Sequence, residues 1–135
     1  MKKINLVLAL SVAVGLIACH NTPATTNKVV SQSHIQGVYK GTLPCADCSG
    51  IETTVTLNND KTYEKLEKYL GKDNANFQEK GTFAFTNDKK QIILTDSSQT
   101  KTYYAIDKNQ IILLGNDGKP SSLPMADQYR LSKVQ

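Results

Sequence analysis

The residues best able to do chemistry are two cysteines, Cys45 and Cys48, in the sequence Pro-Cys-Ala-Asp-Cys-Ser-Gly. Two thiols at this spacing can form a disulfide, hold a soft metal ion such as Cu(I), or act as the redox pair of an oxidoreductase. All three interpretations are open at this point, and the neighbouring residues help to discriminate between them.

The enzyme interpretation is disfavoured by the local sequence. A thioredoxin-like site places its attacking cysteine at a helix N-terminus, which stabilises the thiolate. Here the pair is followed by Ser49-Gly50 and a strand pattern, and the charge of Asp47 disfavours a thiolate. A Ser/His/Asp triad is not expected either, because His20 and His34 lie in or beside a polar N-terminal segment. We therefore predict that the protein is not an enzyme.

Cys45 and Cys48 are candidate copper ligands, because soft thiolates suit Cu(I). Supporting ligands are scarce, since the other candidates are Met125, His34 and His20. A disulfide that serves as a loop clasp is the remaining interpretation, and an oxidising compartment favours it. Closing so short a loop contributes only about 2 kcal/mol, so stability alone is a weak reason for the pair.

The N-terminus has the pattern of a secretory signal, predicted over residues 1–18. Lys2 and Lys3 precede an uncharged run from Ile4 to Ala18, which is shorter than the roughly 20 residues that span a bilayer as a helix. The run ends in Leu-Ile-Ala-Cys, which resembles the bacterial lipobox. Cys19 is therefore predicted to carry diacylglycerol and to become the N-terminus of the mature chain.

Several acyl chains on Cys19 would tie the protein to a membrane. In Gram-negative lipoprotein sorting, Asp directly after the lipidated Cys favours the inner membrane, and His20 stands at that position here. By resemblance to that rule we expect outer-membrane localisation. Residues 19–34, with many Thr, Ser, Asn and Gln, are expected to form a flexible tether. Residues 35–135 are expected to form one domain.

Length and charge exclude several classes of protein. A chain of 135 residues, 39% of them hydrophobic, is enough for one small domain, which excludes a multidomain enzyme. The net charge is +4, but without Lys2 and Lys3 only 14 cationic and 12 acidic side chains remain. This balance gives little support for a phosphate-binding surface, so we expect no nucleic-acid partner.

Short strand patterns alternate with clusters of Asn, Asp and Gly, at the spacing of successive hairpins. In one of them Ile51, Thr53, Val55 and Leu57 fall on a single face. We predict eight strands, near residues 36–43, 51–57, 62–69, 77–85, 91–95, 100–107, 110–114 and 128–134. Consecutive antiparallel strands with short links close most economically into an up-and-down β-barrel, so the predicted fold class is all-β.

One of these segments is ambiguous, because Tyr63, Leu66 and Leu70 also fall at helical spacing. Thr and Tyr favour a pleated surface, and strand patterns surround the segment on both sides. We therefore predict a strand there. The inward pattern of the barrel is mostly Ile, Leu, Tyr and Phe, and these side chains are expected to fill most of its interior.

The run from Gly37 to Thr53, Gly-Val-Tyr-Lys-Gly-Thr-Leu-Pro-Cys-Ala-Asp-Cys-Ser-Gly-Ile-Glu-Thr, followed by Tyr69-Leu70-Gly71, resembles the N-terminal domain of the NlpE (CutF) family. That family consists of Gram-negative outer-membrane lipoproteins linked to copper homeostasis and to surface-adhesion stress signalling. The resemblance implies a small lipocalin-like β-barrel. It also maps Cys19 and the pair Cys45 and Cys48 onto the motifs of the family.

Longer family members carry a second, oligonucleotide-binding-fold domain, for which the residues up to Gln135 are not expected to suffice. The leading hypothesis is an outer-membrane lipoprotein that acts as an envelope-stress sensor or copper-homeostasis binding module, with an envelope signalling protein as partner. The alternatives are a surface-exposed adhesion or interaction lipoprotein that binds a macromolecule, and a carrier of a small apolar ligand.

Overall fold

The structure, a computed structural model, describes residues 34–73, 75–121 and 126–135. The predicted signal peptide, the lipid site Cys19 and residues 20–33 of the predicted tether lie outside these ranges and stay predictions. Within these ranges, no helix is both long enough and apolar enough to cross a bilayer.

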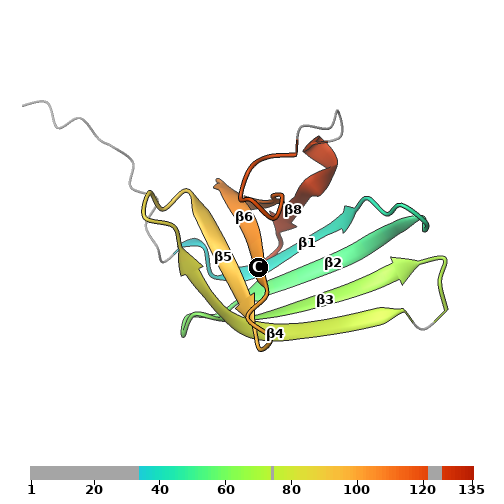
Figure 1. Cartoon of the computed structure of the whole chain (residues 1–135), viewed down its shortest axis with the longest axis horizontal. Helices are drawn as coiled ribbons and strands as arrows, with labels where there is room; N and C mark the ends of the chain where they lie inside the picture. Colours follow the sequence, from blue (N-terminus) through green and yellow to red (C-terminus); the bar gives the residue numbers. More distant parts are fainter. Residues whose placement is uncertain (1–33, 74, 122–125) are drawn as a thin grey trace, which may run out of the picture.

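Eight strands follow one another along the chain and close into a single antiparallel barrel (Figure 1). Each strand pairs with the next, and the last returns to the first through the pair Tyr39↔Lys133. The strands are β1 (Gly37–Leu43), β2 (Gly50–Leu57), β3 (Thr62–Leu70), β4 (Asn76–Phe85), β5 (Gln91–Asp96), β6 (Lys101–Asp107), β7 (Gln110–Leu113) and β8 (Arg130–Lys133), with the 3-10 helix η2 (Ala126–Tyr129) before β8. The prediction of an all-β barrel with about eight strands is confirmed.

The segment with the ambiguous periodicity is strand β3. It pairs along its length with β2 and β4, for example through Leu57↔Tyr63 and Tyr63↔Gly81. Tyr63 is 2% exposed, whereas Leu66 is 45% exposed on the opposite face. Two-residue periodicity therefore governs this segment, because its backbone hydrogen bonds are satisfied by two neighbouring strands rather than by a helix.

The core is one cluster of buried side chains from the inner face of the barrel, as the alternating pattern predicts. Its members are Ile35, Tyr39, Leu43, Val55, Leu57, Tyr63, Phe83, Ile92, Leu94, Tyr104, Ile111 and Leu131. The buried phenol of Tyr39 donates a hydrogen bond to the Ile35 carbonyl at 2.7 Å, which fixes the entry of the chain into β1.

The meander gives the barrel two distinct ends. The β1–β2 loop and the β3–β4 turn lie at one end, which we call the cysteine end (Figure 1), and the order of the strands puts the β5–β6 turn on the same side of the meander. The start of β1, the end of β8, and the β2–β3, β4–β5 and β6–β7 turns lie at the other, which we call the entry end. The two ends therefore carry different sets of side chains.

The inner face also carries charge, which the sequence analysis did not predict. Lys65 of β3 lies 3.0 Å from Glu79 of β4 and 3.7 Å from Glu67. Strands β3 and β4 have nine and ten residues, against four in β7 and in β8. Figure 1 shows β2, β3 and β4 extending past the shorter strands, so part of their inner face lies beyond the apolar core.

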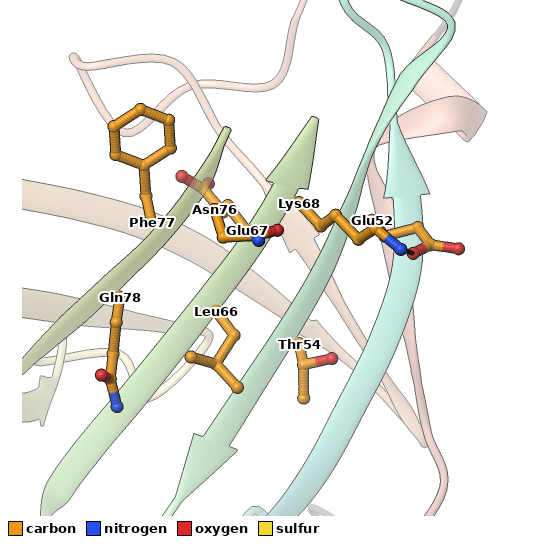
Figure 2. A pocket seen from close by; sticks show the side chains of 8 residues that line it. All are labelled: Glu52, Thr54, Leu66, Glu67, Lys68, Asn76, Phe77 and Gln78. Carbon is orange, nitrogen blue, oxygen red and sulfur yellow. Dashed lines mark ion pairs between the residues drawn. The ribbon is translucent and has the colours of Figure 1, made fainter. Parts of the chain in front are cut away.

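A cavity of about 490 Å³ lies on the outer face of β2, β3 and β4 (Figure 2). Cross-strand neighbours Thr54, Leu66 and Gln78 form part of its wall, and Glu52 and Lys68 approach to 4.0 Å beside them. Phe77 also lines this cavity, but its ring lies on the other face of β4, 5.3 Å from the ring of Tyr69. The sequence analysis did not identify this cavity, although the strand assignment of β3 by itself places Leu66 outside.

Candidate functional site

The candidate site is the β1–β2 loop, residues 44–49, at the cysteine end of the barrel. Strand β1 ends at the buried Leu43, and Pro44 follows it. Strand β2 begins at Gly50, whose φ of 149° lies in a region that side chains rarely adopt. A Cβ at Gly50 would also lie 2.7 Å from Thr42 Cγ2. Proline and glycine therefore bracket the loop that carries the cysteines.

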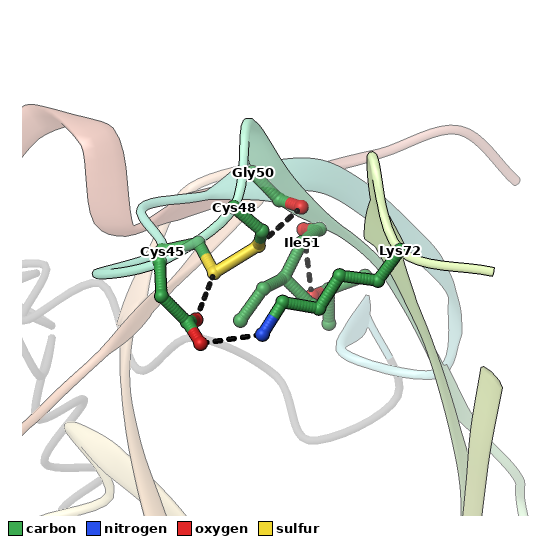
Figure 3. Close-up of a disulfide and its surroundings, with 7 residues drawn as sticks. Cys45, Cys48, Gly50, Ile51 and Lys72 are labelled. Carbon is green, nitrogen blue, oxygen red and sulfur yellow. Dashed lines mark hydrogen bonds and ion pairs between the residues drawn. A yellow bond between two sulfur atoms is a disulfide. The ribbon is translucent and has the colours of Figure 1, made fainter. Parts of the chain in front are cut away.

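Cys45 and Cys48 form a disulfide across this loop, with their Cα atoms 5.3 Å apart (Figure 3). Asp47 lies between them in sequence, and its Oδ1 atom is 3.5 Å from Cys45 Sγ. Cys48 Sγ is 3.3 Å from the carbonyl oxygen of Gly50. The loop thus places two sulfur atoms and one carboxylate close together on a largely exposed surface.

Two contacts hold this loop against the neighbouring β3–β4 turn. Lys72 donates a hydrogen bond to the Asp47 carboxylate and forms an ion pair with it (Figure 3). The Ser49 amide donates to the Leu70 carbonyl at 3.2 Å. The hydrogen bond and the positive charge of Lys72 hold the pKa of Asp47 below its ordinary value, so this carboxylate stays ionised. The sequence analysis did not identify Lys72, which is 24 residues after Cys48.

The structure brings together only some of the predicted metal ligands. Ligand atoms of Cys45, Asp47 and Cys48 all lie within 4.8 Å of one another. His34 lies at the opposite end of the barrel, where its carbonyl accepts a hydrogen bond from Lys133 at 2.8 Å. Met125 and His20 lie outside the described residues.

The donor set fits a soft metal only in its reduced form. A disulfide has no thiolate to donate, whereas two reduced cysteines at this separation supply the sulfur ligands that Cu(I) prefers. The carboxylate of Asp47 is a hard ligand and is already paired with Lys72. Chemically, the loop is therefore a disulfide that reduction converts to a dithiol with an anionic neighbour.

A model of the NlpE N-terminal domain matches residues 39–122, which include the whole disulfide loop. The chain belongs to this family. Lipoprotein NlpE of Escherichia coli (strain K12) is 42% identical over 84 residues, which cover 61% of this chain and 35% of that protein. The 17 kDa lipoprotein of Treponema pallidum (strain Nichols) is 39% identical over 110 residues, 73% of this chain and 70% of that one. The match spans about a third of the E. coli protein.

Solved structures agree with this assignment. A Shewanella oneidensis protein of known structure is 37% identical, with a TM-score of 0.64 over 73% of this chain and 88% of that chain. The crystal structure of the Cpx pathway activator NlpE from Escherichia coli is 36% identical, with a TM-score of 0.59 over 66% of this chain and 47% of that one. The predicted resemblance to the NlpE family is confirmed.

Proposed function

We propose that this protein is an outer-membrane lipoprotein, anchored through Cys19, that acts as an envelope-stress sensor and copper-binding module. The observation that carries the proposal is the Cys45, Asp47, Cys48 group on an exposed loop, with ligand atoms within 4.8 Å of one another. Two relatives bear the name lipoprotein, and one is described as a Cpx pathway activator, which supports an envelope signalling partner.

Sensing begins with the redox state of the loop. Reduction of the Cys45–Cys48 disulfide takes two electrons and two protons from a dithiol reductant, which becomes a disulfide in turn. The two cysteines would then hold Cu(I) through their sulfur atoms and release their protons. The negative charge of Asp47 disfavours free thiolates, so the thiols keep their protons until a cation takes their place. Hydrogen bonds and an ion pair join the cysteine loop to the β3–β4 turn, so a conformational change at the sulfur atoms affects both the loop and this turn.

A Cu(I) titration tests the binding part of this proposal. All proteins carry Cys19→Ser, so that the third cysteine of the chain cannot contribute. We expect the reduced protein to take up one Cu(I) per chain from a chromophoric chelator, and the oxidised protein to take up none. The matched variant with Cys45→Ser and Cys48→Ser should fail to compete with the chelator. Equal uptake by that variant would remove the copper role.

Membrane placement is tested separately. Density-gradient fractionation of cells should place the intact protein with outer-membrane porins, and Cys19→Ser should release it into the soluble envelope fraction. Mass spectrometry of the intact protein should show the acyl chains on Cys19. An unmodified N-terminus, or recovery with the inner membrane, would contradict this placement.

The second candidate function is an interaction lipoprotein that binds a macromolecule. It is favoured by two exposed apolar side chains: Leu66, 45% exposed in the wall of the outer cavity, and Phe77, 59% exposed on the other face of the sheet. Protease treatment of intact cells discriminates between the candidates, since a surface adhesin is cleaved and a head that faces the periplasm is protected. A carrier function for a small apolar ligand stays a prediction. The interior of the barrel holds a cluster of packed apolar side chains.

A further inference from the structure

The entry end of the barrel is one continuous rim. Backbone hydrogen bonds join each of its turns to the next strand but one: Phe83 N donates to Lys61 O at 2.8 Å, and Ile106 N donates to Lys90 O at 2.9 Å. In the same way Lys133 N donates to the carbonyl of Asn109 at 2.7 Å. The β2–β3, β4–β5 and β6–β7 turns therefore form a connected surface around the point where the described chain begins.

Each of these three turns presents lysine at the same kind of backbone position. Lys61, Lys89 and Lys108 have φ angles of 65°, 57° and 52°. Gly and Asn are the residues that adopt this conformation most readily, and a lysine there is intrinsically less favourable. Among the described residues, the other non-glycine residue with positive φ is Gln99, at the cysteine end. A backbone cost repeated at three turns of one rim suggests a functional reason for the charge.

The lysines of this rim project into solvent, and we call Lys61, Lys89, Lys90 and Lys108 the basic rim. All four are exposed. Across the described part of the chain, no ion pair within 4.0 Å involves any of them. Lys61 extends over the ring of Phe85, with its Nζ 5.6 Å from the ring centroid. No carboxylate of the described residues therefore holds these four ammonium groups in an ion pair.

The carboxylates of the same end are engaged by the barrel itself. Asp60 accepts hydrogen bonds from the amide and hydroxyl of Thr62, and Asp88 accepts from the Thr86 hydroxyl at 2.7 Å. Asp107 is 3.0 Å from the guanidinium of Arg130. These contacts hold the three ionised carboxylates against their own turns, and the four lysines of the basic rim outnumber them.

The opposite end of the barrel has the reverse balance of charge. It carries four aspartates, Asp47, Asp73, Asp96 and Asp117, against three lysines, Lys72, Lys101 and Lys119, while Asp127 pairs with Arg130, which also pairs with Asp107. Lysines therefore outnumber aspartates at the entry end, and aspartates outnumber lysines at the cysteine end. Such a distribution orients a protein in the field of a charged surface.

We propose that the basic rim docks the barrel on the anionic phospholipid face of the membrane to which the protein is anchored. The inference rests on the Cys19 anchor of the proposed function for its orientation. Fifteen positions separate Cys19 from His34, and a chain of that length reaches at most about 50 Å. His34 lies at the rim, so the anchor brings the lysines, rather than the cysteine loop, toward the headgroups.

Two features of the rim suit a phospholipid surface. Lysine ammonium groups attract anionic headgroups over about one Debye length, without requiring a fixed geometry of phosphates. Val134 is 53% exposed at the same end and offers an apolar side chain at headgroup depth. Docking by this end leaves the Cys45–Cys48 loop pointing away from the bilayer, where copper, reductants and partners can reach it.

Vesicle sedimentation tests the proposal with a protein that cannot carry the lipid. The mature chain from residue 19, with Cys19→Ser, is mixed at low salt with phosphatidylcholine vesicles that contain or lack phosphatidylglycerol. The rim variant carries Lys61→Asn, Lys89→Asn and Lys108→Asn, because asparagine tolerates positive φ and keeps the turns folded. The control variant removes three lysines from the other half of the barrel through Lys68→Gln, Lys101→Gln and Lys119→Gln.

We expect binding only to vesicles with phosphatidylglycerol, with a steep loss at high salt. Each lysine near an anionic surface contributes roughly a fivefold increase in partitioning, so the rim variant should bind on the order of 100-fold more weakly. The control variant, which has the same net charge, should bind nearly as well as the parent.

Three results would overturn the proposal: equal losses in the two variants, no preference for anionic vesicles, or tighter binding to a DNA duplex than to vesicles at the same salt. The protein in the vesicle assay carries no lipid and no copper. The outcome of vesicle sedimentation is therefore independent of the outcome of the Cu(I) titration. Mass spectrometry of Cys19 reports separately on the anchor.

Discussion

The charged group on the inner face of the barrel supports a quantitative prediction. Lys65 has only 10% of its side chain exposed, and it lies 3.0 Å from Glu79 and 3.7 Å from Glu67. Glu79 also accepts a hydrogen bond from the Tyr63 hydroxyl at 2.5 Å. One cation therefore compensates two carboxylates on a surface that is mostly shielded from water.

Replacing Lys65 with methionine keeps the apolar stem and removes the charge. Breaking a fully buried ion pair by removing one partner costs about 3–5 kcal/mol. The two carboxylates keep 23% and 30% of their side-chain exposure, so water compensates part of the loss. We expect Lys65→Met to lower the free energy of unfolding by about 2 kcal/mol, which at a urea m-value near 1 kcal/mol/M moves the midpoint by about 2 M.

Urea unfolding of two further variants separates this mechanism from a general loss of packing. Adding Glu79→Gln to Lys65→Met removes one uncompensated carboxylate and should recover about 1 kcal/mol. Lys68→Met, three positions along the same strand, breaks an exposed pair with Glu52 at 4.0 Å and should cost less than about 0.5 kcal/mol. A cost for Lys65→Met as small as that of Lys68→Met, or a further loss of stability on adding Glu79→Gln, would refute a role for uncompensated charge.

Three further predictions concern the fold and the loop. A Cβ at Gly81 would lie 2.0 Å from the carbonyl oxygen of Thr95, so Gly81→Ala should force β4 from β5 and cost about 1–3 kcal/mol in urea unfolding; an unchanged midpoint would contradict this close approach. Burial raises the pKa of Tyr39 to about 12, so its contribution to stability is fully present below pH 10 and is lost as pH rises toward 12. Tyr39→Phe should therefore lose stability less steeply over that range, and an identical pH dependence would refute the shift. Replacing both Cys45 and Cys48 with serine should lower the free energy of unfolding by no more than about 2 kcal/mol, and complete unfolding of this variant would show that the clasp holds the barrel together.

The strands of this protein could be predicted because their signal is local. Alternation of inward and outward side chains follows from backbone geometry, and Val55 and Leu57 obey it in the structure as they do in the sequence. Hairpin turns are equally local, since Asp60 and Asp88 bind backbone amides two residues further on. The cysteine pair is also encoded within four residues. Fold class, strand order and the disulfide loop were therefore accessible from the sequence.

The tertiary structure decided which distant residues meet. Closure of the barrel joins β1 to β8, and only then does the Lys133 side chain reach the carbonyl of His34. The pairing of Asp47 with Lys72 depends on two loops that converge at one end. The same holds for Lys65 and Glu79, which face each other because β3 and β4 share a register. Periodicity fixes the face on which a side chain lies, but its neighbours are set by register and closure, which no local segment contains.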